Sequence, residues 1–434
     1  MQRQARTASS IRVPQPRPPD PDVDPHPLAS WLLKMGFDLT IEAIYRREVL
    51  LPPDFRMAPG TLIASNHQRD VDGPMLGTVL IRRRGLRFLN PLPFYATRED
   101  LFRPGILARL TVHWPRPLPA LLRWISLAWF FPLGRTEPMR RVREFTLGEA
   151  LRVLVEAGFG DDDAGSLLNA RGQRETGISP GDLSTSALLE RADDVLEGWW
   201  GLRRLRVDAR AAIAPGFRAT VDRQLANFAR HLDRGCCVYF APEGTVSMDG
   251  CFSRIRAGFF RLARMAESAP WIQPIALGYD TLAPGRSRVV IRAGRAFRAD
   301  TSACRRTFDA ELRRAIVAVA TITPSHLLAR FLHHGPPGFT VSDLARWLEH
   351  AHGALAKHGV PLDPLFARVP ARRLATRRLR WLARKRLVRR EGNIYRNTCR
   401  RDAPPGWGHA VNSTRYLDNA LASLVPDIEC LAPC

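Results

Sequence analysis

Two patterns of apolar positions alternate along much of the chain. Short, almost fully apolar runs such as GTLIASNH at 60–67 are typical of buried strands. Between these runs, apolar residues recur every three to four positions. This is clearest at 217–235, where Gly235 suits the carboxyl cap of a helix. Strands that alternate with helices predict an α/β fold with a central mixed β-sheet flanked by helices.

The same patterns predict the order of the elements around the first polar motif. We expect a covering helix over 28–50 and a buried strand over 60–67 that ends at His67. Pro74 then suits the first turn of the next helix. Further along, the expected elements are the helix over 217–235, a strand over 236–240, a helix over 252–266, and strands over 271–279 and 288–297.

The pattern divides the chain into three parts. Residues 1–27 contain many Pro, Arg and Asp residues, which predicts a disordered tail. Residues 28–320 carry the α/β pattern, and a polar, glycine-rich insertion at about 157–213 interrupts them, which we expect to be partly loop. Residues 321–434 have a helical pattern and many basic residues, which predicts an additional helical C-terminal region.

Composition limits the class of protein. The chain has 434 residues, of which 45% are hydrophobic, and its formal net charge is +23. The positive excess predicts attraction to polyanions, such as an anionic membrane surface, nucleic acid or phosphorylated substrates. Seven cysteines without a CxxC pair favour a reducing compartment and free thiols.

No apolar run is long enough to cross a bilayer, and the N-terminus lacks the apolar core of a secretory signal. We therefore expect a cytoplasmic protein. The stretch LPALLRWISLAWFFPLG at 118–134 is rich in Trp and Phe and fits either a membrane-interface segment or a buried core helix.

The first candidate site is SNHQRDVDGPM at 65–75. His67 lies at the expected end of a strand, where ligands bind in open α/β sheets, and Asp72 follows five residues later. On one continuous helix the two would point to different faces, so they meet only if the chain turns between them. A carboxylate that orients an imidazole makes it a general base. The alternative is a loop histidine, with Asp72 as a helix cap.

Two further candidate motifs lie later in the chain. In YFAPEGTVS at 239–247, Glu243, Gly244 and Thr245 come directly after another predicted strand, and such a turn suits a phosphate or polar headgroup. In WFFPLGRTEP at 129–138, Arg135 follows an apolar run and suits bidentate phosphate binding. The alternatives are a plain turn with a capping threonine and a solvated surface arginine.

Together with QPIALGY at 273–279, these motifs resemble the sequence blocks of the glycerolphosphate and lysophosphatidic acid (1-acylglycerol-3-phosphate) acyltransferase superfamily. That family carries Asn-His-x4-Asp, a Gly-x-x-Arg-type block, Phe-Pro-Glu-Gly-Thr and an apolar block around a proline. The matching residues here are Asn66-His67 with Asp72, Gly134-Arg135, Pro242-Glu243-Gly244-Thr245 and Pro274. The likeness covers roughly residues 45–300, and four blocks in order are far more specific than one.

The resemblance implies a glycerolphosphate acyltransferase-like fold. It also implies the transfer of a fatty acyl group from acyl-CoA or acyl-carrier protein to a hydroxyl of a glycerol phosphate or lysophospholipid. His67 would act as the general base and Asp72 would orient it, while Arg135, Glu243, Gly244 and Thr245 would bind the acceptor. The family needs no cofactor, no metal and no acyl-enzyme, and the sequence contains no GxSxG nucleophile elbow. The resemblance thus implies an enzyme of lipid metabolism on the inner face of the membrane.

Two departures from the family pattern concern the acceptor. Arg69 stands where the family often has Ser, and it suits either a substrate phosphate or the surface. Asp70 adds a second carboxylate near His67, although spacing favours Asp72 as its partner.

The segment ARRLATRRLRWLARKRLVRREGNIYRNTCRR at 371–401 holds thirteen basic residues and one acidic residue. It suits anionic lipid headgroups or a solvated helix face, and its pattern also resembles a helix followed by a wing, as in nucleic-acid-binding proteins. The leading hypothesis is an O-acyltransferase at a membrane surface, for which nucleic acid is not an expected partner. The alternative is a non-catalytic basic lipid- or nucleic-acid-binding protein on a degenerate acyltransferase scaffold.

Overall fold

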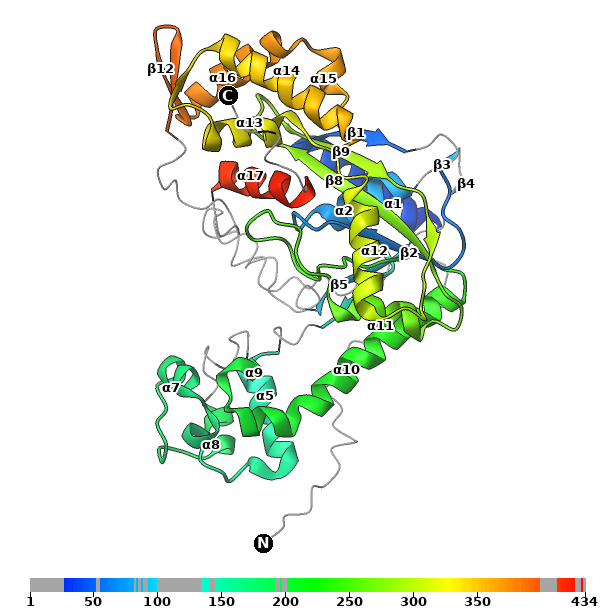
Figure 1. The fold of residues 1–434 in the computed structure, drawn as a ribbon. Coiled ribbons are helices and arrows are strands. Elements are labelled where there is room, and N and C mark those ends of the chain that lie inside the picture. Colours follow the sequence, from blue (N-terminus) through cyan, green and yellow to red (C-terminus); the bar gives the residue numbers. More distant parts are fainter. Residues whose placement is uncertain are drawn as a thin grey trace. The chain divides into compact units, whose positions relative to one another are not determined.

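The computed structural model describes residues 27–51, 55–81, 83–84, 87–88, 93–99, 134–140, 145–191, 196, 201–398, 412–425 and 431. Residues 1–26 of the predicted tail and 118–133 of the Trp-rich stretch lie outside this range. The chain forms two compact units (Figure 1). We call Pro25–Tyr95 with Ala229–Cys434 the α/β unit, and Met1–Asp24 with Ala96–Phe228 the helical unit.

A mixed β-sheet is the centre of the fold, and its order is β1-β9-β8-β2-β7-β5-β6, with β10 paired to β8. Its strands are β1 (Tyr45–Leu50), β2 (Thr61–Ser65), β5 (Phe94–Arg98), β6 (Thr136–Met139), β7 (Val238–Tyr239), β8 (Trp271–Asp280), β9 (Ser287–Ala293) and β10 (Phe297–Arg298). Strand β2 runs parallel to both neighbours, β7 and β8, whereas β8 and β9 are antiparallel. The predicted α/β class with a mixed central sheet is therefore confirmed. A separate small sheet pairs β3 (Arg83–Arg84) with β4 (Arg87–Phe88).

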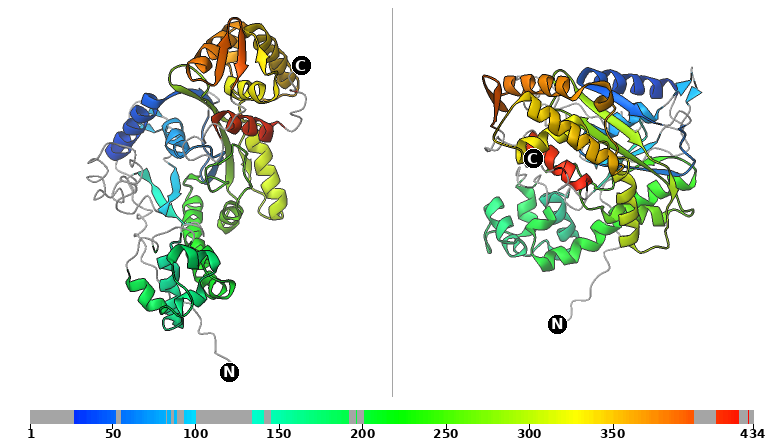
Figure 2. Two further views of the ribbon diagram at one scale, coloured as in Figure 1. Left: turned by 90° about the vertical axis from the view of Figure 1, so that its left-hand side faces the viewer. Right: turned by 45° about the horizontal axis from the view of Figure 1, so that its top comes forward.

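Helices cover both faces of this sheet in the α/β unit. Helices α1 (Pro27–Ile44) and α2 (Asp72–Leu80) lie on one face, and α11 (Ala257–Met265) and α12 (Arg305–Val317) lie on the other (Figure 2). Aromatic rings of α11 and α12 pack against each other at Phe259 and Phe308. The sequence expectation of one helix over 28–50 is wrong for its last six residues. Residues Tyr45–Leu50 instead form strand β1, whose register with β9 runs from Tyr45↔Ser287 to Leu50↔Arg292.

The helical unit contains most of the predicted insertion. Its helical elements are α5 (Leu147–Leu154), η4 (Val155–Phe159), α6 (Ala164–Leu167), α7 (Ala170–Thr176), α8 (Thr185–Glu190), α9 (Gly201–Arg204) and the first part of α10 (Val207–Asp233). The insertion, expected to be partly loop, also contains the two short helices α6 and α7, whose N-termini are capped by Asp163 and Asn169. Gly172 permits close packing rather than a loop, because a Cβ there would lie 2.4 Å from the Arg204 carbonyl oxygen.

The C-terminal region is helical but also contains a small sheet that the apolar pattern did not predict. Its helices are α13 (Pro324–His334), α14 (Val341–Lys357), α15 (Leu365–Arg368), α16 (Ala371–Arg384) and α17 (Ser413–Leu424). Strands β11 (Gly338–Phe339), β12 (Val388–Glu391) and β13 (Ile394–Asn397) form an antiparallel sheet in the order β11-β13-β12. These strands are short and expose most of their side chains, so they have no buried run to reveal them.

A buried ion pair joins the C-terminal region to the end of β8. Arg378 of α16 donates to the Asp280 carboxylate at 2.7 Å and to the Leu282 carbonyl oxygen at 2.6 Å. Ser325 of α13 donates to the same carboxylate. Burial alone would raise the pKa of Asp280, but Arg378 and Ser325 hold it below the ordinary value, so the carboxyl remains ionised.

We expect Arg378→Ala to lower the free energy of unfolding by about 3 kcal/mol, because it leaves a buried carboxylate without its main partner. Unfolding in guanidinium chloride measures this change. Arg380→Ala, at an exposed position of the same helix, is the matched control and should stay within about 0.5 kcal/mol of wild type. Equal stabilities of the two variants would show that the pair does not hold the region in place.

Candidate functional site

Strand β2 carries the chain to the site. All five of its residues are buried, and it pairs with β7 and β8 on its two edges. Asn66 continues this pairing with its side chain, which donates to the Leu277 carbonyl oxygen at 2.9 Å and accepts from the Leu277 N–H at 2.8 Å. The backbone is therefore fixed on β8 at the residue that precedes His67.

A tight turn then brings Asp72 back to His67. One oxygen of the fully buried Asp72 carboxylate accepts from the backbone N–H groups of Gln68 at 2.7 Å and Arg69 at 2.9 Å. The same oxygen lies 3.0 Å from Nδ1 of His67. The two residues thus meet through a turn, as their spacing requires. Asp70 is exposed, so Asp72 is the carboxylate that contacts the ring.

This contact fixes the protonation of the imidazole. A carboxylate only accepts hydrogen bonds, so the proton of the neutral ring lies on Nδ1 of His67. Nε2 is then left with its lone pair, and it makes no hydrogen bond to any residue that the structure describes. The His67 side chain keeps 19% of its surface exposed. The pair therefore leaves Nε2 of a partly exposed imidazole available to a ligand.

Tyr279 of β8 completes the environment of the carboxylate. Its hydroxyl donates to the second oxygen of Asp72, although 207 positions separate them in the chain. Burial and the neighbouring carboxylate raise the pKa of Tyr279 far above its ordinary value, so the hydroxyl stays protonated and remains a donor. Arg69 lies over the same ring, with its guanidinium carbon 4.8 Å from the ring centroid.

Glu243 holds the loop after β7 against the end of β2. One of its carboxylate oxygens accepts from the backbone N–H of His67 and the other accepts from that of Ser253, both at 2.7 Å. In addition, the N–H of Ser247 donates to the His67 carbonyl oxygen at 2.9 Å. The structure thus brings Glu243 to the histidine as a buried bridge between two backbone segments. Its predicted role in acceptor binding stays a prediction.

Burial changes the acidity of this bridge. It raises the pKa of the Glu243 carboxyl to about 7, although the backbone N–H groups of His67 and Ser253 act in the opposite direction. The carboxyl therefore exchanges its proton near neutral pH.

The remaining predicted site residues have different surroundings. Gly244 has φ +65°, and a Cβ there would lie 3.1 Å from Cγ of Arg256, so a glycine suits this turn. Thr245 is half-buried in the same loop. Arg135 belongs to the helical unit, where it adopts φ +51°. The roles of all three in acceptor binding stay predictions.

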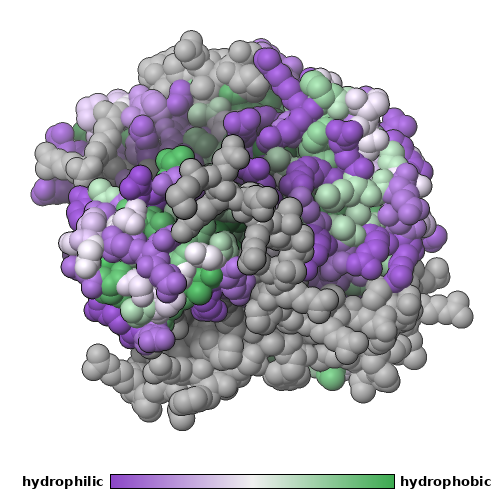
Figure 3. All heavy atoms as spheres, turned by 90° about the horizontal axis from the view of Figure 1, so that it is seen from below, coloured by the Kyte–Doolittle hydropathy of each residue, from purple (hydrophilic) through white to green (hydrophobic). Residues whose placement is uncertain are grey.

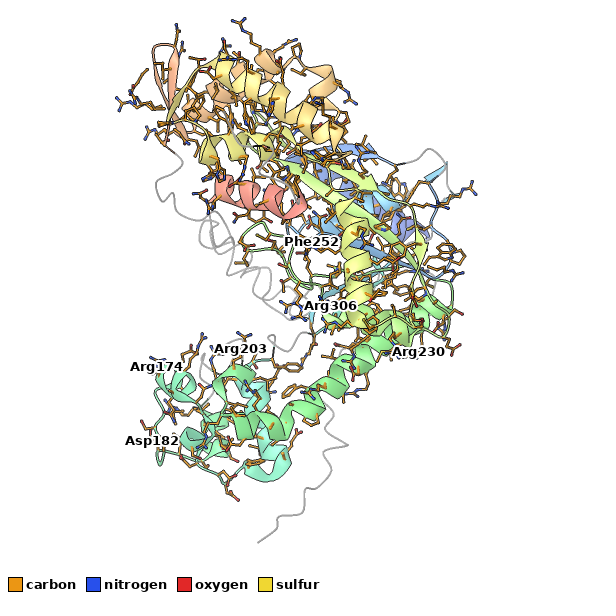
Figure 4. All side chains as sticks on the ribbon, in the orientation of Figure 1. Arg174, Asp182, Arg203, Arg230, Phe252 and Arg306 are labelled. Carbon is orange, nitrogen blue, oxygen red and sulfur yellow. The ribbon has the colours of Figure 1, made fainter. Side chains whose placement is uncertain are left out.

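The motifs did not point to two tyrosines at this site. Tyr279 belongs to an apolar strand pattern, in which a buried hydroxyl leaves no separate signal. Tyr416 of α17 donates from its hydroxyl to the Gln68 carbonyl oxygen at 3.2 Å and comes from 348 positions away. The loop of Glu243 also meets α17, where the N–H of Phe252 donates to Ser423 at 3.1 Å (Phe252 is labelled in Figure 4). No sequence spacing could have predicted either tyrosine.

A pocket of about 550 Å³ opens beside the site. Its lining residues are Glu42, Tyr45, Arg46, Arg47, Val49, Leu51, Thr78, Val79 and Arg286. None of the candidate catalytic residues lines it. Tyr45 connects it to the site, because its ring packs edge-on against Tyr279 at 5.9 Å between centroids. Its hydroxyl also accepts from Arg69 at 3.4 Å. The pocket lining combines three arginines with one glutamate and apolar side chains, and Glu42 is already paired with Arg47.

No protein-family model matches the chain, and no curated protein matches its sequence. None of the helices that the structure describes is long and apolar enough to cross a membrane. The described part of the face in Figure 3 is mostly hydrophilic, with scattered apolar side chains.

Glu243→Gln tests the bridge through the pH dependence of stability. The folded-state pKa of about 7 lies above the ordinary value of 4.5, so the folded chain holds this proton more tightly than the unfolded chain. Wild-type stability should therefore fall as pH rises from 4.5 to about 7, by up to about 1.4 kcal/mol per pH unit from this group. The glutamine amide does not titrate, so the variant should lose this component.

Denaturant unfolding at pH 5, 6 and 7 measures the difference between variant and wild type, in which the other titrating groups largely cancel. At pH 5 the variant should be less stable, because its amide NH2 group faces one of the two backbone donors. The difference should then move in favour of the variant as pH rises. Parallel pH profiles would contradict the raised pKa.

Proposed function

We propose that the protein is an O-acyltransferase that moves a fatty acyl group from a thioester to a hydroxyl of a glycerol phosphate or lysophospholipid. One observation carries the proposal: His67 is bonded through Nδ1 to the buried Asp72 at the end of strand β2, and Nε2 is left as the base. The motif resemblance supplies the reaction class, and the α/β unit would be a glycerolphosphate acyltransferase-like fold.

In the proposed reaction, Nε2 of His67 takes the proton of the acceptor hydroxyl as its oxygen attacks the thioester carbonyl carbon. The C–O bond forms, the tetrahedral intermediate collapses and the C–S bond breaks. The imidazolium then returns its proton to the leaving thiolate. The base is restored in one cycle without an acyl-enzyme.

Asp72 would stabilise the imidazolium formed in this step, because its charge lies 3.0 Å from Nδ1. The N–H groups of Gln68 and Arg69 and the hydroxyl of Tyr279 all donate to this carboxylate. These donors fix the position of the carboxylate. They support a role in orienting and stabilising the base, not one in accepting its proton.

Several parts of this function rest on the resemblance. Arg135, Glu243, Gly244 and Thr245 are proposed to bind the acceptor, and acyl-CoA or acyl-carrier protein is the proposed donor. We also propose a cytoplasmic protein that associates peripherally with the inner face of the membrane. The positive net charge of +23 favours contact with anionic lipid.

A thioester-release assay with the purified chain tests the reaction class. The donors are acyl-CoA and acyl-carrier protein of several chain lengths, and the acceptors are glycerol 3-phosphate, lysophosphatidic acid and lysophospholipids without a phosphomonoester. Acyl product and free thiol should form in equal amounts with at least one acceptor. Thiol release without acyl product would indicate a hydrolase instead.

We expect His67→Ala to lower kcat/KM by about 10³-fold, since general-base catalysis is worth about 10²–10⁴-fold. Asp72→Asn should also be strongly impaired, because the amide favours the wrong tautomer of the ring. Asp70→Asn is the matched control: it changes an exposed carboxylate two positions away and should retain wild-type rates. The measurement is acyl product formed per enzyme under single-turnover conditions.

Equal turnover by wild type and His67→Ala would remove the catalytic assignment. Loss of activity in Asp70→Asn with retention in Asp72→Asn would exchange the roles of the two carboxylates. A wild type that transfers no acyl group to any acceptor of the panel would favour the alternative of a non-catalytic binding protein.

A further inference from the structure

The C-terminal region has a distinctive order of elements. Its chain runs α13-β11-α14-α16-β12-β13, with the short α15 between α14 and α16. Strand β11 pairs with β13, and β13 pairs with β12. Three helices closed by a β-hairpin form the arrangement of a winged helix, in which the third long helix and the hairpin lie next to each other in sequence. Figure 1 shows the hairpin of β12 projecting from the helices of this region.

Helix α16 divides cleanly into a buried and a basic face. Its buried positions are Leu374, Ala375, Arg378, Leu379 and Leu382. Its exposed arginines are Arg372, Arg373, Arg377, Arg380 and Arg384. At 100° per residue the five arginines fall within an arc of about 140° and extend over about 18 Å of the helix. None of their guanidinium groups is bonded to a residue that the structure describes.

The hairpin that packs against α16 is also mostly basic. Val388 and Tyr395 are its buried anchors, while Arg389, Arg390 and Arg396 are exposed. Gly392, with φ +62°, makes the tight turn between the strands. Glu391 is its one carboxylate, and it lies 2.6 Å from Arg396 and 3.5 Å from Arg389. Lys385 and Arg386, also exposed, link the helix to the hairpin.

The back of α16 is held rigidly, which leaves its basic face free. Leu379 and Leu382 are fully buried in the apolar core of the C-terminal region. Arg378 lies on the buried side of the helix, where it forms the ion pair with Asp280. The exposed positions of α16 are all arginines. A helix fixed in this way loses little backbone freedom when it binds an anionic partner.

We propose that the outer face of α16 and the β12–β13 hairpin bind double-stranded DNA, with the helix in the major groove and the hairpin along the phosphates. The major groove of B-DNA, about 12 Å wide, admits one α-helix. Arginine is the side chain best suited to contact both phosphates and guanine edges. The interaction does not depend on acyl transfer, and it departs from the expectation that nucleic acid is not a partner. The structure adds that the face of α16 that carries these arginines is the exposed one.

The shape of the surface favours a grooved partner over a membrane. A bilayer presents a plane, which suits basic residues around an apolar patch that inserts. Here Ile394 is the one large exposed apolar residue recorded between 371 and 398. The deep, narrow major groove of A-form RNA excludes such a helix, so DNA is also favoured over duplex RNA.

Fluorescence anisotropy with a labelled random-sequence DNA duplex tests the proposal on the full-length chain. Affinity is measured at several salt concentrations, because each phosphate that a variant no longer neutralises should reduce the slope of log K against log [salt] by about 0.9. We expect Arg377→Gln/Arg380→Gln/Arg384→Gln to weaken binding at least about tenfold and to reduce the slope by about 2 to 3. Duplex RNA of the same length should bind more weakly than DNA.

Two control variants separate local charge from net charge and from folding. Arg218→Gln/Arg306→Gln/Arg314→Gln removes the same charge from exposed helix positions elsewhere (Arg306 is labelled in Figure 4) and should bind like wild type. Arg377→Lys/Arg380→Lys/Arg384→Lys keeps the charge and should retain most of the affinity. Vesicles containing phosphatidylglycerol are tested with the same proteins.

Three outcomes would overturn the proposal. The first is that the wild type does not bind the duplex. The second is that the α16 Gln triple and the Arg218/Arg306/Arg314 Gln triple lose DNA affinity equally. The third is that the α16 Gln triple loses vesicle binding while its DNA binding is unchanged. The last outcome would assign the face to the membrane. Acyl transfer by the α16 triple is measured in parallel, so that failure of DNA binding and failure of the proposed enzyme activity remain distinguishable.

Discussion

The buried carboxylate of Asp72 is the interaction on which the site depends. It lies at the start of α2 and is fully buried. It is hydrogen-bonded to the backbone of the turn, to the ring of His67 and to the hydroxyl of Tyr279. A buried carboxylate without hydrogen-bond partners would be strongly unfavourable. The hydrogen bonds to Asp72 therefore stabilise it, and they also fix the turn between His67 and Asp72. The geometry of the His67–Asp72 pair is therefore a consequence of burying one carboxylate just beyond the carboxyl end of strand β2.

A second buried carboxylate, Glu243, fixes the other side of the site. Because it binds the backbone of His67 and Ser253, a movement of its loop would also move the backbone at His67. Its raised pKa records the cost of burial. The two carboxylates have different hydrogen-bond partners. Asp72 contacts the imidazole ring of His67, whereas Glu243 accepts hydrogen bonds from the backbone N–H groups of His67 and Ser253. An acceptor ligand at Glu243 would have to share oxygens that already accept from the protein.

The C-terminal region connects to the same framework through a third acid, Asp280, at the end of β8. Strand β8 carries Leu277, which fixes Asn66, then Tyr279, which binds Asp72, and finally Asp280, which binds Arg378. One strand therefore supports both the candidate catalytic site and the anchoring of the basic helix. The two surfaces share a rigid element, while their proposed functions use different residues and different chemistry.

The sequence by itself determined the alternation of strands and helices, the end of β2 near His67, the motif blocks and the excess of arginine. These features are local, since periodicity and spacing are properties of neighbouring residues. Only the tertiary structure decided that Asp72 and not Asp70 meets the ring, that Glu243 bridges two backbones and that Tyr279 belongs to the site. It also decided that Tyr45–Leu50 is a strand and that the arginine face of α16 is the exposed one and lies beside a hairpin. Each of these features depends either on contacts between residues far apart in the chain or on which side of an element is buried. The spacing of neighbouring residues determines neither of the two.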